Sequence, residues 1–442
     1  MIQTGLIQNA HSDLVTDAIY DFYGLRLATC SLDQRIKVWR LDENTGTWSV
    51  EDDWKAHDAP VSKLSWAHPE FGTIIASSSF DRTVKIWEQS IQTAAEQQQS
   101  STSGPGPSTS RWVERIALPD ARGTVRAVEF APHQFGLKLA TIATDNILRI
   151  YECLDQPTLS QWQLAEDIDI ANAVPGPSPS HVTRAQTAAL ATPTQTHSSL
   201  DGVSAPLVAQ GLQAHLQQST PVPPSRATLG NREADGGWTL SWCKDRYWGE
   251  IIAAGAGNNG VVKIIQLNAR RSNVLLTLDG SPATSGSVTP AVAGHITAGG
   301  NESAPQQGAP SAQQAYSVTS VAWAPSCGRS YHLVATGSRD GHVRIWKLKP
   351  PPEDFNEDDM HEDGKWTATI VGDFDQHKSA VGRVEWNITG TVLSSAGNDG
   401  RIRLWKANAE GVWKPAGSIG VEQTAEEPAS QPESKDVDME DN

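Results

Sequence analysis

The chain has 442 residues, a formal net charge of −16 at pH 7 and a hydrophobic content of 38%. This length allows two to four ordinary domains or one large domain built from repeats. No basic block is present to neutralise phosphates, so direct nucleic-acid binding through a charged face is not expected. The four cysteines form no CxxC pair, which is typical of a reducing compartment and indicates neither a disulfide framework nor a zinc site. The N-terminus has no apolar leader and the chain no apolar run of 18 residues, so we expect neither secretion nor membrane spanning.

Six repeats follow one another along the chain. Each contains three apolar runs of four to six residues bounded by turn signals, a pattern that predicts strands rather than helices. The first run ends in a bulky residue in every repeat: Tyr20, Trp66, Phe130, Trp242, Trp323 and Trp386. The third run ends at Trp39, Trp87, Tyr151, Ile265, Trp346 and Trp405, six positions after the turn residues Asp33, Asp81, Asp145, Asn259, Asp340 and Asp399.

Three of the repeats add a His and a hydroxyl residue at fixed offsets. The complete sets are His11, Thr29, Asp33 and Trp39, then His57, Ser77, Asp81 and Trp87, and finally His377, Ser395, Asp399 and Trp405. In the hydrogen-bond tetrad of WD repeats, a buried Asp carboxylate accepts a hydrogen bond from His. The same His is hydrogen-bonded to a Ser or Thr hydroxyl, and this hydroxyl also contacts the indole N–H of Trp. We therefore predict an all-β chain with a six-bladed WD40 β-propeller. The fourth repeat has Glu233, Gly255, Asn259 and Ile265 in these places and is expected to be the least rigid.

Segments without aromatic residues or with strong acidity interrupt the repeats. They are rich in Gln, Ser, Thr, Pro, Ala and Gly or in acids, and cannot bury enough apolar surface to offset the ordering of the chain. We predict disordered inserts at about 90–110, 171–235, 279–314 and 350–364, and a disordered acidic tail at 421–442. One propeller domain over residues 1–420 accounts for the rest.

No pattern in the chain indicates an enzyme. His, Ser and Asp recur together with Trp in three repeats, which favours a structural tetrad over a nucleophilic triad. Gly255, Gly257 and Gly260 match GxGxxG, but no helix N-terminus is expected there to hold a phosphate. We predict no catalytic, cofactor-binding or metal-binding residues. An enzyme with a site in the central channel remains a distant alternative.

Several stretches carry a family resemblance. Residues 54–88 (WKAHDAPVSKLSWAHPEFGTIIASSSFDRTVKIWE) resemble the second repeat shared by two sister WD-repeat coat proteins, the Sec-type COPII outer-coat subunit and the Seh-type nucleoporin. Three further stretches resemble the Seh type: TLSQWQL at 158–164, residues 327–350 and residues 374–408. A COPII subunit acting in ER-to-Golgi vesicle transport is the alternative.

The resemblance implies a non-catalytic scaffold subunit of the Y-shaped nuclear pore subcomplex, which serves pore assembly and the transport of mRNA and protein. It also implies a second role in the SEA/GATOR-type coat that regulates TORC1 at the vacuole or lysosome membrane. The implied partners are other Y-complex subunits, vacuolar coat subunits and an α-solenoid nucleoporin that donates a blade to an open propeller. The implied location is the nuclear envelope, with peripheral association at the vacuole.

The two ends of the chain bear on how such a propeller would close. Residues 411–419 (GVWKPAGSI) supply a candidate fourth strand for the sixth blade, so the N-terminal segment is not required there. Unclosed sheet edges invite strand addition. We therefore predict that Ile2, Leu6 and Ile7 lie beside the partner's blade.

Overall fold

A computed structural model describes residues 7–91, 110–174, 236–268, 272–280, 316–351 and 365–420. Within these ranges the chain forms six four-stranded antiparallel sheets and two short 3₁₀ turns, η1 (Pro69–Phe71) and η3 (His133–Phe135). No helix in this part of the chain has the length and apolar character needed to cross a membrane. The six predicted blades are confirmed.

Each blade consists of four strands that are consecutive in the sequence and neighbours in the sheet. The strands of the first three blades are β1 (Val15–Tyr20), β2 (Arg26–Ser31), β3 (Arg35–Asp42) and β4 (Thr47–Lys55); β5 (Val61–Trp66), β6 (Ile74–Ser79), β7 (Val84–Ile91) and β8 (Ser110–Leu118); and β9 (Val125–Phe130), β10 (Lys138–Ala143), β11 (Ile147–Cys153) and β12 (Trp162–Asp169).

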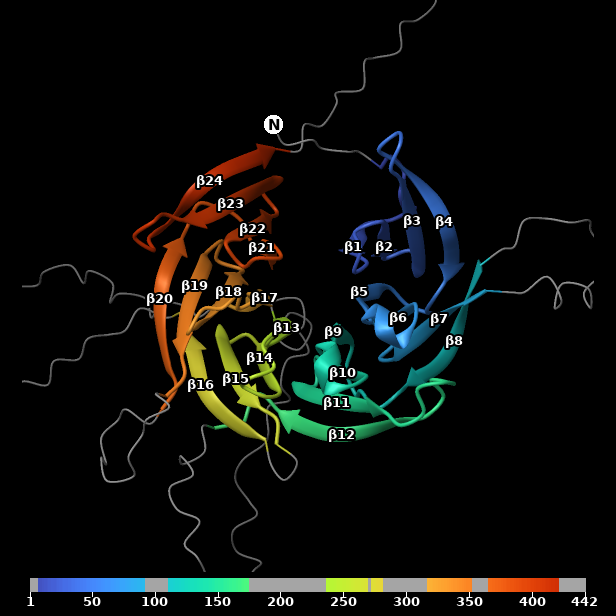
Figure 1. Ribbon diagram of the computed structural model, residues 1–442, viewed down its shortest axis with the longest axis horizontal. Helices are drawn as coiled ribbons and strands as arrows, with labels where there is room; N and C mark the ends of the chain where they lie inside the picture. The colour runs from blue at the N-terminus through green and yellow to red at the C-terminus, as the bar shows by residue number, and fades with distance from the viewer. Residues whose placement is uncertain are drawn as a thin grey trace, which may run out of the picture.

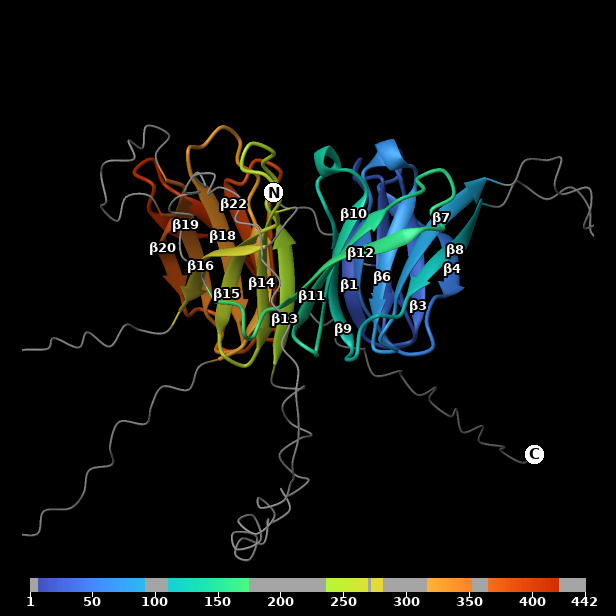
Figure 2. The same cartoon turned by 90° about the horizontal axis from the view of Figure 1, so that it is seen from below.

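Blades four to six repeat the same order. Their strands are β13 (Gly237–Trp242), β14 (Ile251–Gly257), β15 (Val261–Gln266) and β16 (Asn273–Asp279); β17 (Val318–Trp323), β18 (His332–Ser338), β19 (Val343–Lys349) and β20 (Thr367–Phe374); and β21 (Val381–Trp386), β22 (Val392–Gly397), β23 (Arg401–Ala407) and β24 (Trp413–Gly420). Figure 1 shows the blades as a ring with the first strand of each innermost, and Figure 2 shows the ring from the side. The fourth strand expected from residues 411–419 is β24, which pairs with β23.

The turn between the second and third strands explains the repeated Asp or Asn. In every blade this side chain accepts a hydrogen bond from the backbone N–H two residues later, which fixes the hairpin. The residue between them has positive φ, which Gly260, Gly341 and Gly400 adopt readily in blades four to six. In blades one to three Gln34, Arg82 and Asn146 adopt the same conformation, so the turn forms there without Gly.

Most predicted inserts lie outside the described residues, as does the tail at 421–442. The described residues reach a few positions into the ends of these ranges. β7 extends to Ile91 and β8 begins at Ser110, because these residues extend the outer pair of blade two. Residues 171–174 are also described, and Ala173 donates its N–H to the Asp169 carbonyl (2.8 Å).

The core of the ring lies between the blades. Five apolar clusters join consecutive blades, one at each boundary from blades one and two to blades five and six. In each cluster the last bulky residue of the third strand packs toward the preceding blade. These residues are Trp87, Tyr151, Ile265, Trp346 and Trp405. Among the described residues, no such cluster joins blade six to blade one.

Candidate functional site

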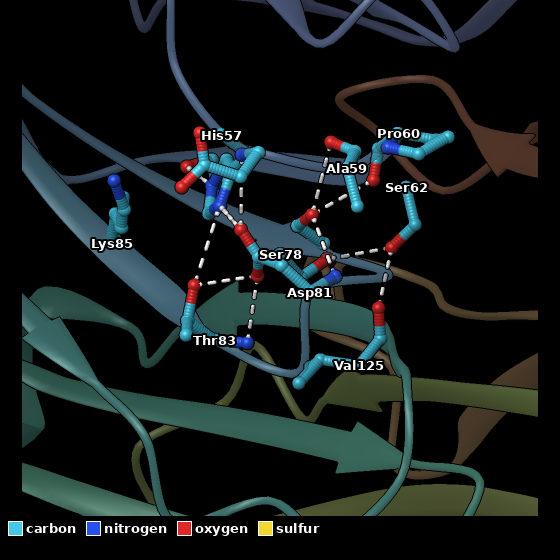
Figure 3. Close-up of polar contacts among 12 residues, drawn as sticks. His57, Ala59, Pro60, Ser62, Ser78, Asp81, Thr83, Lys85 and Val125 are labelled. Atoms are coloured by element: carbon cyan, nitrogen blue, oxygen red, sulfur yellow. Dashed lines mark hydrogen bonds and ion pairs between the residues drawn. The ribbon is translucent and has the colours of Figure 1, made fainter.

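The residues of the second predicted tetrad are hydrogen-bonded to one another within blade two. Figure 3 shows two of them, His57 and Asp81, together with Thr83. His57 contacts Asp81 through Nδ1 (2.8 Å) and the Ser77 hydroxyl through Nε2 (2.7 Å). Ser77 Oγ also accepts the indole N–H of Trp87 (2.9 Å). Burial by itself raises the pKa of Asp81, but the hydrogen bonds from His57 and Thr83 outweigh burial and hold this pKa well below its usual value.

The tetrads of blades one and six have the same connections. In blade one, His11 bonds Asp33 (3.0 Å) and Thr29 (2.8 Å), and Trp39 donates to Thr29 (2.9 Å). In blade six the matching distances are 3.2, 2.7 and 2.9 Å for His377 to Asp399, His377 to Ser395 and Trp405 to Ser395. The polar side-chain atoms of each set have hydrogen-bond partners within their own blade. These sets therefore stabilise the sheet and do not present unpaired reactive groups.

The boundary between blade six and blade one, which we call the seam, has a different character. Figure 1 shows blade six (red) and blade one (blue) as the two ends of the ring. On blade one, the face that points away from blade two carries Leu27, Trp39, Val50 and Tyr20 on neighbouring strands. Tyr20 is 59% exposed and Val50 is 50% exposed. At the same place as Tyr20, Trp242 and Trp323 are at most 2% exposed, because the preceding blade covers them.

Blade six presents the opposite face of the seam. Ile402 there is 37% exposed and Leu404 is half-buried. At the position of Ile402 the other five blades have Ile36, Val84, Leu148, Val262 and Val343, each at most 2% exposed. Tyr20, Val50 and Ile402 are therefore apolar side chains that the described residues leave exposed at the seam, whereas Leu27 and Trp39 on the blade-one face are buried.

One ionic contact crosses the seam near the channel. Arg383 of β21 donates to the Asp17 carboxylate (2.5 Å) and to the Ala18 carbonyl (3.0 Å) of β1. Asp17 also pairs with Lys63 (3.2 Å) and accepts the Leu64 N–H (3.0 Å). Burial alone raises the pKa of Asp17, yet the charges of Lys63 and Arg383 outweigh burial and hold this pKa below its usual value.

The comparisons with known proteins agree with this architecture. The family model "WD domain, G-beta repeat" matches residues 3–40, 48–88, 310–347 and 368–406. Nucleoporin SEH1 of Saccharomyces cerevisiae is 30% identical over 444 residues, which cover 94% of this chain and 99% of that protein. Nucleoporin seh1 of Schizosaccharomyces pombe is 30% identical over 436 residues (96% and 98%), and Nucleoporin SEH1 of Homo sapiens is 32% identical over 411 residues (92% and 86%).

The chain belongs to the SEH1 family of nucleoporins. In this family member, blades three and four lie outside the matched repeats, and the third strand of each lacks Trp. Blade three replaces the His contact by Arg149, which pairs with Asp145 (2.6 Å). Blade four has Lys263 at the equivalent position, and its Nζ donates to the carbonyls of Ile170 (2.5 Å), Ala171 (3.2 Å) and Ala173 (2.5 Å). Glu233 lies outside the described residues.

Two tryptophans of blade four had no role in the repeat pattern. Trp238 donates its indole N–H to the Asn146 side chain in the turn of blade three (2.8 Å). Trp248 meets His332 and Trp366 of blade five edge-on, with ring centroids 5.9 and 5.6 Å apart. Both join blade four to its neighbours. Only the spatial order of the blades reveals these partners, since they are distant in the sequence.

The central channel holds a cavity of about 420 Å³ lined by all six inner strands. Its ionisable side chains are paired: Asp17 with Lys63 and Arg383, Glu129 with Lys244, and Glu385 with Arg383. Among the described residues, no group of three His, Cys, Asp or Glu side chains is placed to hold a metal ion. Family membership and fold indicate a structural protein rather than an enzyme.

Of the three residues predicted to lie beside the partner, Ile2 and Leu6 fall outside the described residues. Ile7 is described and is half-buried. Its place beside a partner stays a prediction.

Proposed function

We propose that the chain is a scaffold subunit of the nuclear pore complex at the nuclear envelope, and that it binds its partner at the seam. The observation that carries the proposal is the contrast between five boundaries with apolar cores and the seam, where the described residues form none. The relatives' name, nucleoporin, supports the pore as the location. A blade with two apolar faces would cover Tyr20 and Val50 on one side and Ile402 on the other.

The finer parts of the proposal follow from the family resemblance. The partner is an α-solenoid nucleoporin of the Y-shaped subcomplex that donates strands to the seam, with the N-terminal residues Ile2, Leu6 and Ile7 beside them. A second role in the vacuolar coat that regulates TORC1 belongs to the same proposal. The scaffold acts through binding and holds no cofactor.

The test is affinity purification followed by quantitative binding. The chain should co-purify with solenoid nucleoporins, and recovery of the COPII outer-coat partner instead would refute the proposal. Val50→Asp places a charge on the seam face and should weaken binding to the purified solenoid nucleoporin of the same species. Leu154→Asp is the matched control, because Leu154 is 59% exposed on blade three, away from the seam. Deletion of residues 1–8 should also weaken binding.

A further inference from the structure

The six innermost strands, β1, β5, β9, β13, β17 and β21, have six residues each and align without gaps. At every packed boundary, the side chain of the third or fifth residue accepts a hydrogen bond from the inner strand of the next blade. The donor is the backbone N–H one position further along. A third-position side chain binds the fourth amide, and a fifth-position side chain binds the sixth amide.

The rule holds at all five packed boundaries with distances of 3.0 to 3.1 Å. Third-position acceptors are Asp17 for the Leu64 amide, Thr239 for Val321 and Ser320 for Val384. Fifth-position acceptors are Ser65 for the Phe130 amide, Glu129 for Trp242 and Ser241 for Trp323. The backbone N–H that each acceptor binds is not paired within the sheet of the donor's own blade, because it points toward the neighbouring blade.

Blade six has Arg383 at the third position and Glu385 at the fifth. Arginine has no acceptor atom, so it cannot accept a hydrogen bond from a backbone N–H, and Arg383 donates across the seam to Asp17 instead. Glu385 has two acceptor oxygens, and its side chain is 62% exposed. One oxygen lies 3.2 Å from Arg383 Nε, and the carboxylate retains further acceptor sites for another donor.

We propose that Glu385 is a partner-binding residue that accepts a backbone N–H from the innermost strand of the inserted blade. The inference rests on the proposed function, since it requires a blade in the seam, and entry of that blade separates Arg383 from Asp17. The bound amide belongs to the sixth residue of that strand. This residue is bulky, because Phe130, Trp242 and Trp323 carry the amides bound by the other fifth-position side chains. The hydrogen bond sets the register of the partner strand against β21.

Three variants of the full chain test the role of Glu385 against the purified solenoid nucleoporin of the same species. Glu385→Ala removes the acceptor and should weaken binding about tenfold, as expected for a hydrogen bond to a charged group. Glu385→Ser should bind within about twofold of the wild type, because Ser65 and Ser241 make the same contact at packed boundaries. Glu152→Ala, which removes an exposed acid on blade three, should bind as the wild type.

The melting temperature separates a binding role from a folding role. Ser241→Ala breaks an equivalent contact at a packed boundary and should lower the melting temperature, whereas Glu385→Ala should leave it unchanged. Wild-type affinity in Glu385→Ala, or equal loss in Glu385→Ser and Glu385→Ala, would overturn the inference while the seam remains the binding site. If the wild-type chain does not bind the solenoid nucleoporin, the proposed function fails and the inference fails with it.

Discussion

Replacing Ser77 by Ala tests whether the tetrads stabilise the blades. Ser77 is fully buried in β6, and its hydroxyl contacts both His57 Nε2 (2.7 Å) and the indole N–H of Trp87 (2.9 Å). The substitution removes one oxygen and leaves two buried nitrogen groups without a partner. His57 and Trp87 are at most 5% exposed, so water cannot replace the missing contact.

Each of the two buried groups left unsatisfied costs about 1–3 kcal/mol, so we expect Ser77→Ala to lower the free energy of unfolding by about 2–6 kcal/mol. In a domain of this size, at about 2 °C per kcal/mol, that loss corresponds to a fall in melting temperature of about 4–12 °C. Differential scanning calorimetry or urea unfolding measures the change.

The matched control is Thr141→Val in blade three. Thr141 has the same place in the second strand, but the third-strand residue there is Tyr151, whose hydroxyl donates to Asp120 (3.0 Å) instead. Thr141→Val should therefore shift the melting temperature by less than about 2 °C, since no tetrad is broken. If Ser77→Ala unfolds within about 2 °C of the wild type, the tetrad does not stabilise blade two and the reasoning is refuted.

Three further outcomes are expected. Asp81→Asn should lower the melting temperature by several degrees and have no effect on catalysis, because Asp81 is a structural residue. A specific enzymatic activity of the wild type that is lost in a folded Asp81→Asn variant would contradict this. Lys263→Met should cost about 2–4 kcal/mol of unfolding free energy because three carbonyls lose their donor. Lys37→Met removes a contact with Asp53 (3.7 Å) and a distant contact with the Trp39 ring and should cost under about 1 kcal/mol; equal costs in urea unfolding would exclude an anchoring role for Lys263. Burial lowers the pKa of His332 in the folded chain, so the His332 imidazole binds a proton more readily in the unfolded chain than in the folded one. Its contribution to stability is full above about pH 6.5 and falls below it; His332→Phe should reduce the loss of melting temperature between pH 7.5 and 5.5, and an equal loss would contradict the pKa argument.

The sequence predicts contacts within a blade well, because their spacing is local. The tetrad residues His57, Ser77, Asp81 and Trp87 all lie within one repeat, and the sheet brings them together whatever surrounds the blade. The turn residues follow the same logic, since each binds a backbone N–H two residues away.

Contacts between blades escape this kind of prediction. Lys263 donates to carbonyls 90 to 93 positions earlier, around the start of a predicted insert, and Arg383 pairs with Asp17 from the opposite end of the repeat array. Neither pairing has a sequence offset that recurs in another repeat. The alignment of the inner strands does recur, and it could have shown that Arg383 and Glu385 stand where other blades have acceptors for the next blade.

The tetrads of the two end blades have a physical role. Blades two to five each have an apolar core on both faces; blade two has a complete tetrad, whereas blades three, four and five lack one. Blades one and six flank the seam, and both have the complete set. A blade packed on one face loses part of the apolar burial that stabilises its neighbours. Hydrogen bonds within the blade offset that loss without needing cover from outside. The tetrads of His11 and His377 thus allow the two end blades to keep their shape with one face less covered, which the partner-binding surface proposed for the seam would require.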